Sequence, residues 1–205
     1  MMHNEVISEE LKHVINKVFE SSGFDHFNLG GGTALALQLG HRISIDADFI
    51  CAKDFDKEAI LKLVLDTFPG ANDIHTGTFG VFLKVGNVKL DFLSWGIPFI
   101  RPAVEIRNWR LLNIGDIAAM KCFAILQRGE KKDYIDIAAI LKEYHLGQIL
   151  SFYKERHSGS DVATIIRFLS SYSDIEQQPL PTMMDHTTWD EAKQVIQHSI
   201  TEFMK

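Results

Sequence analysis

The hydrophobic pattern of the chain changes at about residue 110. Before that point short strand-like segments alternate with helical ones, whereas from Ile114 onward every periodic segment fits a helix and no convincing strand remains. We therefore expect an α+β fold. A mixed-sheet core would occupy residues 1–110, and a helical region over residues 111–205 would pack beside it across a cleft.

Periodicity and boundary residues place the individual elements. In the first part we expect helices at Val6–Ser21, Thr33–Leu39 and Phe55–Phe68, and strands at His26–Leu29, Ile43–Ile50, Thr78–Val85 and Val88–Ser94. The last two strands flank Gly86-Asn87, a pair typical of tight hairpin turns because both residues tolerate positive φ. In the second part we expect helices at Ile114–Arg128, Lys131–Tyr144, Gly147–Arg156, Val162–Ser171 and Thr188–Phe203.

Composition and charge exclude several classes of protein. The 205 residues suffice for one large domain or two small ones in contact, and 46% hydrophobic with 23% charged residues is ordinary for a globular chain. With 27 acidic and 21 basic residues the net charge is −6, so we do not expect duplex DNA as a partner. Basic residues do gather between Arg101 and Lys132, where they could form a local basic lip or a solvated helix face.

The sequence also carries expectations about location. Met1–Phe19 is charged and amphipathic, unlike a secretory signal, and no apolar run approaches the roughly 18 residues of a membrane span. Cys51 and Cys122 belong to no Cys-x-x-Cys pair, so neither a disulfide framework nor a thiolate zinc site is indicated. We expect a cytoplasmic protein without a membrane partner.

Two carboxylates share one face of the predicted strand Ile43–Ile50. The alternation sets Ile43, Ile45, Ala47 and Phe49 on one face and Ser44, Asp46 and Asp48 on the other. Two ionised carboxylates this close repel, and the usual remedies are a raised pKa, a cationic neighbour or a divalent cation. Mg²⁺ suits such a pair because it combines one or two carboxylates with substrate phosphates. Taken alone, the pattern favours two solvated acids on an exposed strand face.

A glycine turn precedes this strand. Gly31-Gly32 lies between a predicted strand and helix, where missing Cβ atoms let backbone N–H groups approach a phosphate and the helix N-terminus adds positive potential. Thr33 could cap that helix or donate its hydroxyl to the same phosphate. The alternative is a plain tight turn.

A third acid, Asp91, lies in the strand Val88–Ser94 with Leu90 and Phe92 facing the other way, so it could sit beside Asp46 and Asp48. There it would complete a two-metal site or accept a proton from an attacking hydroxyl. A surface salt bridge is the alternative.

Together these elements resemble a known family. The stretch Leu29–Phe49 joins the Gly31-Gly32 pair, a short helix, Arg42-Ile43-Ser44 and Asp46-Ala47-Asp48, and so looks like the signature of the AbiEii/AbiGii toxin family of polymerase-β-like nucleotidyltransferases. The resemblance implies a polymerase-β-like nucleotidyltransferase core. It also implies site roles: Asp46 and Asp48 bind Mg²⁺ or Mn²⁺, Asp91 is the third acid, and Gly31, Gly32, Thr33 and Ser44 hold the nucleotide phosphates.

A second block, Lys121-x-x-Ala124-x-x-x-Arg128, is similar to a less distinctive motif of the family. Lys121 and Arg128 are seven residues apart, hence on one helix face, which suits gripping a triphosphate or a nucleic-acid backbone. Asp133 and Asp136 follow one turn apart on the next helix. We expect Asp136 to orient Arg128 by ion pairing and leave the role of Asp133 open.

Two residues before the strand complete the candidates. Arg42 is expected to contact a phosphate or an acid, and His41 to be a turn residue. From Gly147 onward the sequence shows no recognisable motif.

The resemblance implies a metal-dependent enzyme that transfers a nucleoside monophosphate from a nucleoside triphosphate to an acceptor hydroxyl. It further suggests the toxin of a bacterial toxin–antitoxin or abortive-infection system, with a cognate antitoxin encoded nearby. The acceptor could be tRNA, a protein or a small molecule, and the nucleotide is not specified. One alternative is an inactive nucleotide- or partner-binding module on the same fold. Another is a nucleotide-sugar glycosyltransferase, which also uses D-x-D but leaves Gly-Gly-Thr unexplained.

Overall fold

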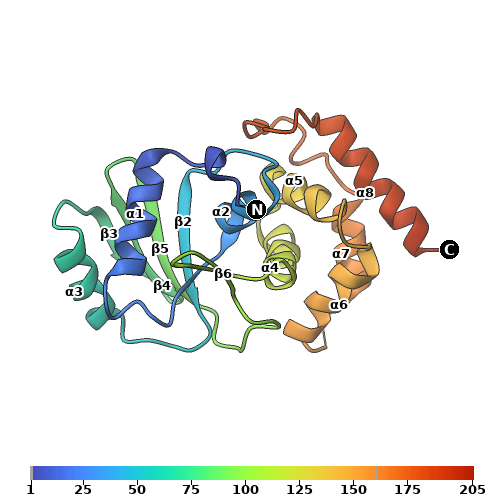
Figure 1. The fold of residues 1–205 in the computed structure, drawn as a ribbon. Coiled ribbons are helices and arrows are strands. Elements are labelled where there is room, and N and C mark those ends of the chain that lie inside the picture. The colour runs from blue at the N-terminus through green and yellow to red at the C-terminus, as the bar shows by residue number, and fades with distance from the viewer. Residues whose placement is uncertain (1, 160) are drawn as a thin grey trace.

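The computed structural model describes residues 2–159 and 161–205 and confirms the α+β class (Figure 1). One mixed sheet has the strand order β3-β4-β5-β2-β1-β7-β6. The strands are β1 (Asn28–Leu29), β2 (Asp46–Cys51), β3 (Asn72–Thr76), β4 (Gly80–Val85), β5 (Val88–Ser94), β6 (Val104–Ile106) and β7 (Trp109–Leu111). The helices are α1 (Glu9–Glu20), α2 (Gly31–Leu39), α3 (Lys57–Thr67), α4 (Ile114–Gln127), α5 (Lys131–Ile140), α6 (Leu146–Arg156), α7 (Val162–Leu169) and α8 (Trp189–Phe203), and a 3₁₀ turn covers Asn4–Val6.

The predicted hairpin is present. β4 and β5 pair antiparallel. β4 ends at Val85, β5 begins at Val88, and Gly86 lies in the turn between them with φ +59°. β5 then pairs with β2 in parallel, which brings the two acid-bearing strands side by side at the centre of the sheet. The short strands β3, β6 and β7 were not predicted, and β7 ends next to the expected boundary at residue 110.

One face of the sheet is covered by α1 and α3, which lie on the same side in Figure 1. Aromatic rings fill this layer: Phe92 stacks on Phe49 at 5.5 Å and on Phe24 at 4.9 Å between ring centroids. All three side chains are fully buried. Because side chains alternate along a strand, the neighbours of Phe49 and Phe92, which include Asp48 and Asp91, project from the opposite face.

The helices α4 to α8 gather at the other end of the molecule (Figure 1). The first of them, α4, is buried almost all round and packs against α2, α5, α6 and α7. Helix starts follow ordinary capping, since the side chains of Asn113 and Thr188 accept backbone N–H groups at the starts of α4 and α8. Among residues 2–159 and 161–205, no helix combines the length and apolar character needed to cross a bilayer.

A segment from the last third of the chain pairs with the residues just before β2. Ile43 N–H donates to the Thr182 carbonyl at 2.8 Å, and Met184 N–H donates to the His41 carbonyl at 2.9 Å. These bonds occupy the backbone before β2, so the strand begins at Asp46 instead of Ile43. The prediction that Ile45 shares a strand face with Ala47 and Phe49 was therefore wrong, because those two side chains are buried and that of Ile45 is 69% exposed in the connection.

Candidate active site

The glycine turn lies directly against the D-x-D strand. Gly30 N–H donates to the Asp48 carbonyl at 2.7 Å, which fixes the start of α2 on β2. Gly31 has φ +59°, and a Cβ there would stand 2.0 Å from Asp48 Oδ2. A Cβ on Gly32 would stand 2.2 Å from Arg42 Nη2. Position 31 therefore requires glycine because of its positive φ and the adjacent carboxylate, whereas a side chain at position 32 would have to displace the Arg42 guanidinium. The turn brings bare backbone next to a carboxylate and a guanidinium.

Asp48 and Asp91 are neighbours across the β2–β5 pair. The parallel register sets Asp48 opposite Asp91, and Asp46 opposite Lys89. Asp91 is 4% exposed, its Oδ2 accepts from Lys89 Nζ at 2.8 Å, and its Oδ1 is buried without a hydrogen-bond partner. The two carboxylates thus converge, whereas Asp46 lies one pleat away and faces a lysine.

Burial and mutual repulsion act on this acid pair. Burial, followed by the charge of Asp91, raises the pKa of Asp48, while Lys121 and Lys89 act in the opposite direction. Burial also raises the pKa of Asp91 despite its hydrogen bond from Lys89. Within the described residues, no three His, Cys, Asp or Glu side chains stand together as a ready-made metal site. The pair is thus electrostatically unfavourable as it stands, with one lysine as its direct partner.

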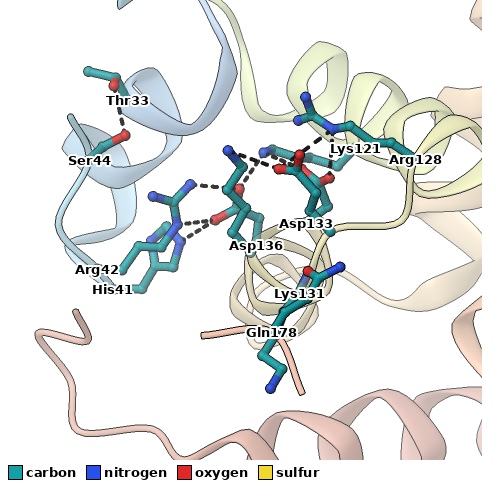
Figure 2. A network of polar contacts seen from close by, with 12 residues as sticks. Thr33, His41, Arg42, Ser44, Lys121, Arg128, Lys131, Asp133, Asp136 and Gln178 are labelled. Atoms are coloured by element: carbon teal, nitrogen blue, oxygen red, sulfur yellow. Dashed lines mark hydrogen bonds and ion pairs between the residues drawn. The ribbon is translucent and has the colours of Figure 1, made fainter. Parts of the chain in front are cut away.

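Thr33 and Ser44 fasten α2 to the start of β2. The Thr33 hydroxyl lies 2.8 Å from the Ser44 hydroxyl and also contacts the Asp46 carbonyl, and both side chains are buried (Figure 2). Of the two roles considered for Thr33, capping of α2 was wrong, because Gly30 occupies the capping position and Thr33 is the third helical residue. Phosphate binding by Thr33 and Ser44 stays a prediction.

A buried charge network joins this region to α4 and α5 (Figure 2). Asp136 accepts from Arg42 Nε at 2.7 Å and Nη2 at 2.9 Å, and from His41 Nε2 at 2.8 Å. Lys121 Nζ lies between Asp136 at 2.5 Å and Asp133 at 2.9 Å. Both aspartates are fully buried, so the network is satisfied only while each charge keeps its partner.

The network determines the protonation state of its acids and bases. Burial alone would raise the pKa of Asp136, but the charges of Lys121 and Arg42 hold it well below its ordinary value. In the same way, Asp136 and Asp133 raise the pKa of Lys121 against the effect of burial. The ionised forms of these groups are therefore the native ones.

The partners within the network differ from those expected. Arg42 contacts an acid, as predicted, and that acid is Asp136. Arg128 is oriented by Asp133, at 3.3 Å, so the prediction that Asp136 orients it was wrong. His41, expected to be a turn residue, lies outside any assigned turn, and its buried ring bonds to Asp136, which no local pattern indicated. Arg128 keeps about half of its side chain exposed, and its charge is felt at Asp48.

Lys89 is the site residue that the sequence reasoning missed. It lies two residues before Asp91 on the same strand face and donates to it. The sequence could have indicated Lys89, because the two-residue side-chain period of a strand sets positions 89 and 91 on one face, as it does positions 46 and 48.

Comparison with known proteins decides the family. Residues 16–158, more than half of the chain, match the family model described as nucleotidyl transferase AbiEii toxin, type IV TA system. The chain belongs to the AbiEii family. Its class is accordingly that of the nucleotidyltransferase toxins, as the resemblance in the sequence implied.

Relatives of this AbiEii protein span nearly its whole length. An uncharacterized protein of Aquifex aeolicus (strain VF5) is 24% identical over 205 residues, covering 97% of this chain and 98% of the relative. Two solved structures share the fold. JHP933 of Helicobacter pylori has a TM-score of 0.58 at 18% identity, covering 96% of this chain and 92% of its own. MenT4, a nucleotidyltransferase toxin of Mycobacterium tuberculosis H37Rv, has a TM-score of 0.61 at 12% identity, covering 94% and 82%.

Proposed function

We propose that this AbiEii protein transfers a nucleoside monophosphate from a nucleoside triphosphate to an acceptor hydroxyl, with Asp48 and Asp91 at the reaction centre. The observation that carries the proposal is the in-register pair Asp48–Asp91 with the Gly31 turn pressed against it. Family membership supports the reaction class, and the buried acid pair supports Asp48 and Asp91 as its centre.

The residues of the chain fit a divalent cation. Asp91 Oδ1 is a buried oxygen without a partner, and Asp48 is a partly buried carboxylate beside it, so oxygen ligands of the kind Mg²⁺ or Mn²⁺ prefers are present. Asp48 and Asp91 would hold the ion, with Asp46, two residues before Asp48 on β2, as a further oxygen donor. When bound, the ion would neutralise the carboxylates and polarise the substrate phosphates.

The proposal assigns roles to the glycine turn, to Asp91 as a base and to two basic side chains. Backbone N–H groups at Gly31 and Gly32 bind the triphosphate, because no Cβ shields them and they begin α2. Asp91 receives the proton of the acceptor hydroxyl, for which its raised pKa is favourable. Lys121 and Arg128, whose charges reach Asp48, offset the negative charge that gathers there.

Turnover is tested with labelled nucleoside triphosphates, Mg²⁺ and a cell extract as the source of acceptors. The wild type is expected to release pyrophosphate and label an acceptor, and Asp48→Asn is expected to do neither. Stoichiometric nucleotide binding by the wild type without pyrophosphate release would instead identify an inactive binding module. The labelled product shows whether the acceptor is tRNA, protein or a small molecule.

We further propose that the protein acts in the cytoplasm as the toxin of a toxin–antitoxin pair with a cognate antitoxin. Family membership supports this role. Induced expression of the wild type should stop bacterial growth, and Asp48→Asn should not. Growth arrest by both variants alike would argue against toxicity through nucleotide transfer.

A further inference from the structure

An aromatic pair lies beside Asp91 on the same face of the sheet. The strand registers pair Asp48 with Asp91, Asp91 with Phe82, and Phe82 with His75. Side chains at paired positions of neighbouring strands project from the same face. Asp48, Asp91, Phe82 and His75 therefore form one continuous row across β2, β5, β4 and β3.

The two rings of this row are stacked. Their centroids are 4.9 Å apart and their planes differ by 11°. The β3–β4 register shifts between Asn72 and His75, and Asp73 has φ +51°, so a bulge sets the direction of the His75 side chain. His75 is exposed and Phe82 half-buried, so the aromatic pair is reachable from solvent.

The stack can be extended in one direction. His75 covers the face of the Phe82 ring that is turned toward β3, so the other face is turned toward β5 and Asp91. A third ring at one further strand spacing, about 4.8 Å, would lie over β5 beside Asp91, which is itself 4% exposed. Helix α1 packs on the opposite, Phe92-bearing face, where its Phe19 ring meets Phe49 at 5.3 Å between centroids.

We propose that Phe82, backed by His75, is a stacking site for a nucleobase bound next to Asp91. The inference rests on the proposed function, which brings nucleotides to this face. A nucleobase is a flat aromatic ring and could stack on the face of Phe82 that is turned toward β5. Stacking on aromatic side chains does not depend on which base is bound.

The position of the slot indicates which base occupies it. The Gly31 turn lies on the β1 side of the acid pair, whereas the Phe82–His75 stack lies on the β4 side. A triphosphate at the glycine turn and a base on Phe82 therefore flank the acids from opposite sides. This is the arrangement expected for the base of an acceptor nucleotide whose hydroxyl is next to Asp91.

Binding measurements with Mg²⁺ test the site and distinguish the two sources of a base. The probes are the four common nucleoside triphosphates, a single-stranded RNA of about ten nucleotides, and inorganic tripolyphosphate, which carries no base. Phe82→Leu should weaken RNA binding about 5- to 150-fold, the range of one lost base stack, and leave tripolyphosphate binding unaffected. Phe82→Tyr should restore binding. Phe203→Leu, at an exposed ring at the end of α8, is the matched control.

Each result has a defined meaning. Weakened nucleoside triphosphate binding with unchanged RNA binding would keep the stacking site but assign it to the donor base. Equal affinities of wild type and Phe82→Leu for every base-bearing probe, or no binding of such probes by the wild type, would overturn the inference. Pyrophosphate release measured in parallel separates the two claims. An active wild type unaffected by Phe82→Leu refutes only the stacking site, and an inactive one whose base binding depends on Phe82 refutes only the transfer reaction.

Discussion

Removing the charge of Asp48 should stabilise the protein when no metal is present. Neighbouring strands are about 4.8 Å apart, and two like charges at about that distance repel by roughly 3 kcal/mol at an effective dielectric constant of about 20. Lys89 and Lys121 offset part of this repulsion. We therefore expect Asp48→Asn to raise the free energy of unfolding by about 1–2 kcal/mol at pH 7. For a chain of this size that corresponds to roughly 2–8 °C in Tm.

The pH dependence provides the internal check. The pKa of Asp48 is raised in the folded state above the ordinary value of 3.8, so ionisation destabilises the fold as pH rises from 3.8 through the folded pKa. The gain in the free energy of unfolding from Asp48→Asn should therefore vanish below about pH 3.8, where the side chain at position 48 is uncharged in both proteins. Urea and thermal unfolding in EDTA measure it, with Asp46→Asn as the control expected to gain less because Asp46 faces Lys89. A loss of more than about 1 kcal/mol in Asp48→Asn at pH 7 would refute the reasoning.

Three further outcomes follow from the network and the glycine turn. Asp136→Asn leaves Arg42 and Lys121 buried with less compensating charge and should cost about 3–5 kcal/mol in urea unfolding; a loss below about 1 kcal/mol would show that the network is dispensable. Because the pKa of Asp136 is lowered, its stabilising contribution is fully present above about pH 3.8 and is lost as pH falls through the folded value. The stability difference between wild type and Asp136→Asn should therefore be largest above about pH 3.8 and shrink at lower pH, and a difference that grows on acidification would contradict the account. Gly31→Ala should abolish pyrophosphate release, since a Cβ would collide with Asp48, whereas Gly70→Ala, with nothing within 4 Å, should retain full activity.

Local patterns predicted most of the helices and the shared face of the acids. The amphipathic and capped segments from Ile114 onward fold within a few residues of the expected bounds, because periodicity and capping are local signals. The strand β3, Asn72–Thr76, was missed because it is a polar edge strand with a bulge and shows no alternation. Ile45 was misplaced because its neighbours bond to a segment near Thr182, far away in sequence.

The site was predicted as a set of residues, but not as a set of contacts. The Asp48–Asp91 neighbourhood followed from two strands that each carry acids on one face, and the register bears it out. The pairing of Arg42 with Asp136 could not be predicted, because it depends on how α5 packs against α2 across a separation of 94 residues. The functional roles of these side chains, the metal and the division at residue 110 stay predictions.

A Mn²⁺ titration followed by electron paramagnetic resonance of the free ion tests the central claim most directly. In the presence of a nucleoside triphosphate analogue that cannot be cleaved, the wild type should take up Mn²⁺. Asp48→Asn and Asp91→Asn should each weaken that uptake at least about tenfold, because each removes one of the carboxylates that would hold the ion. Asn in place of the exposed Asp25 should leave it unchanged. Equal Mn²⁺ uptake by all four proteins would contradict the assignment of Asp48 and Asp91 as the reaction centre.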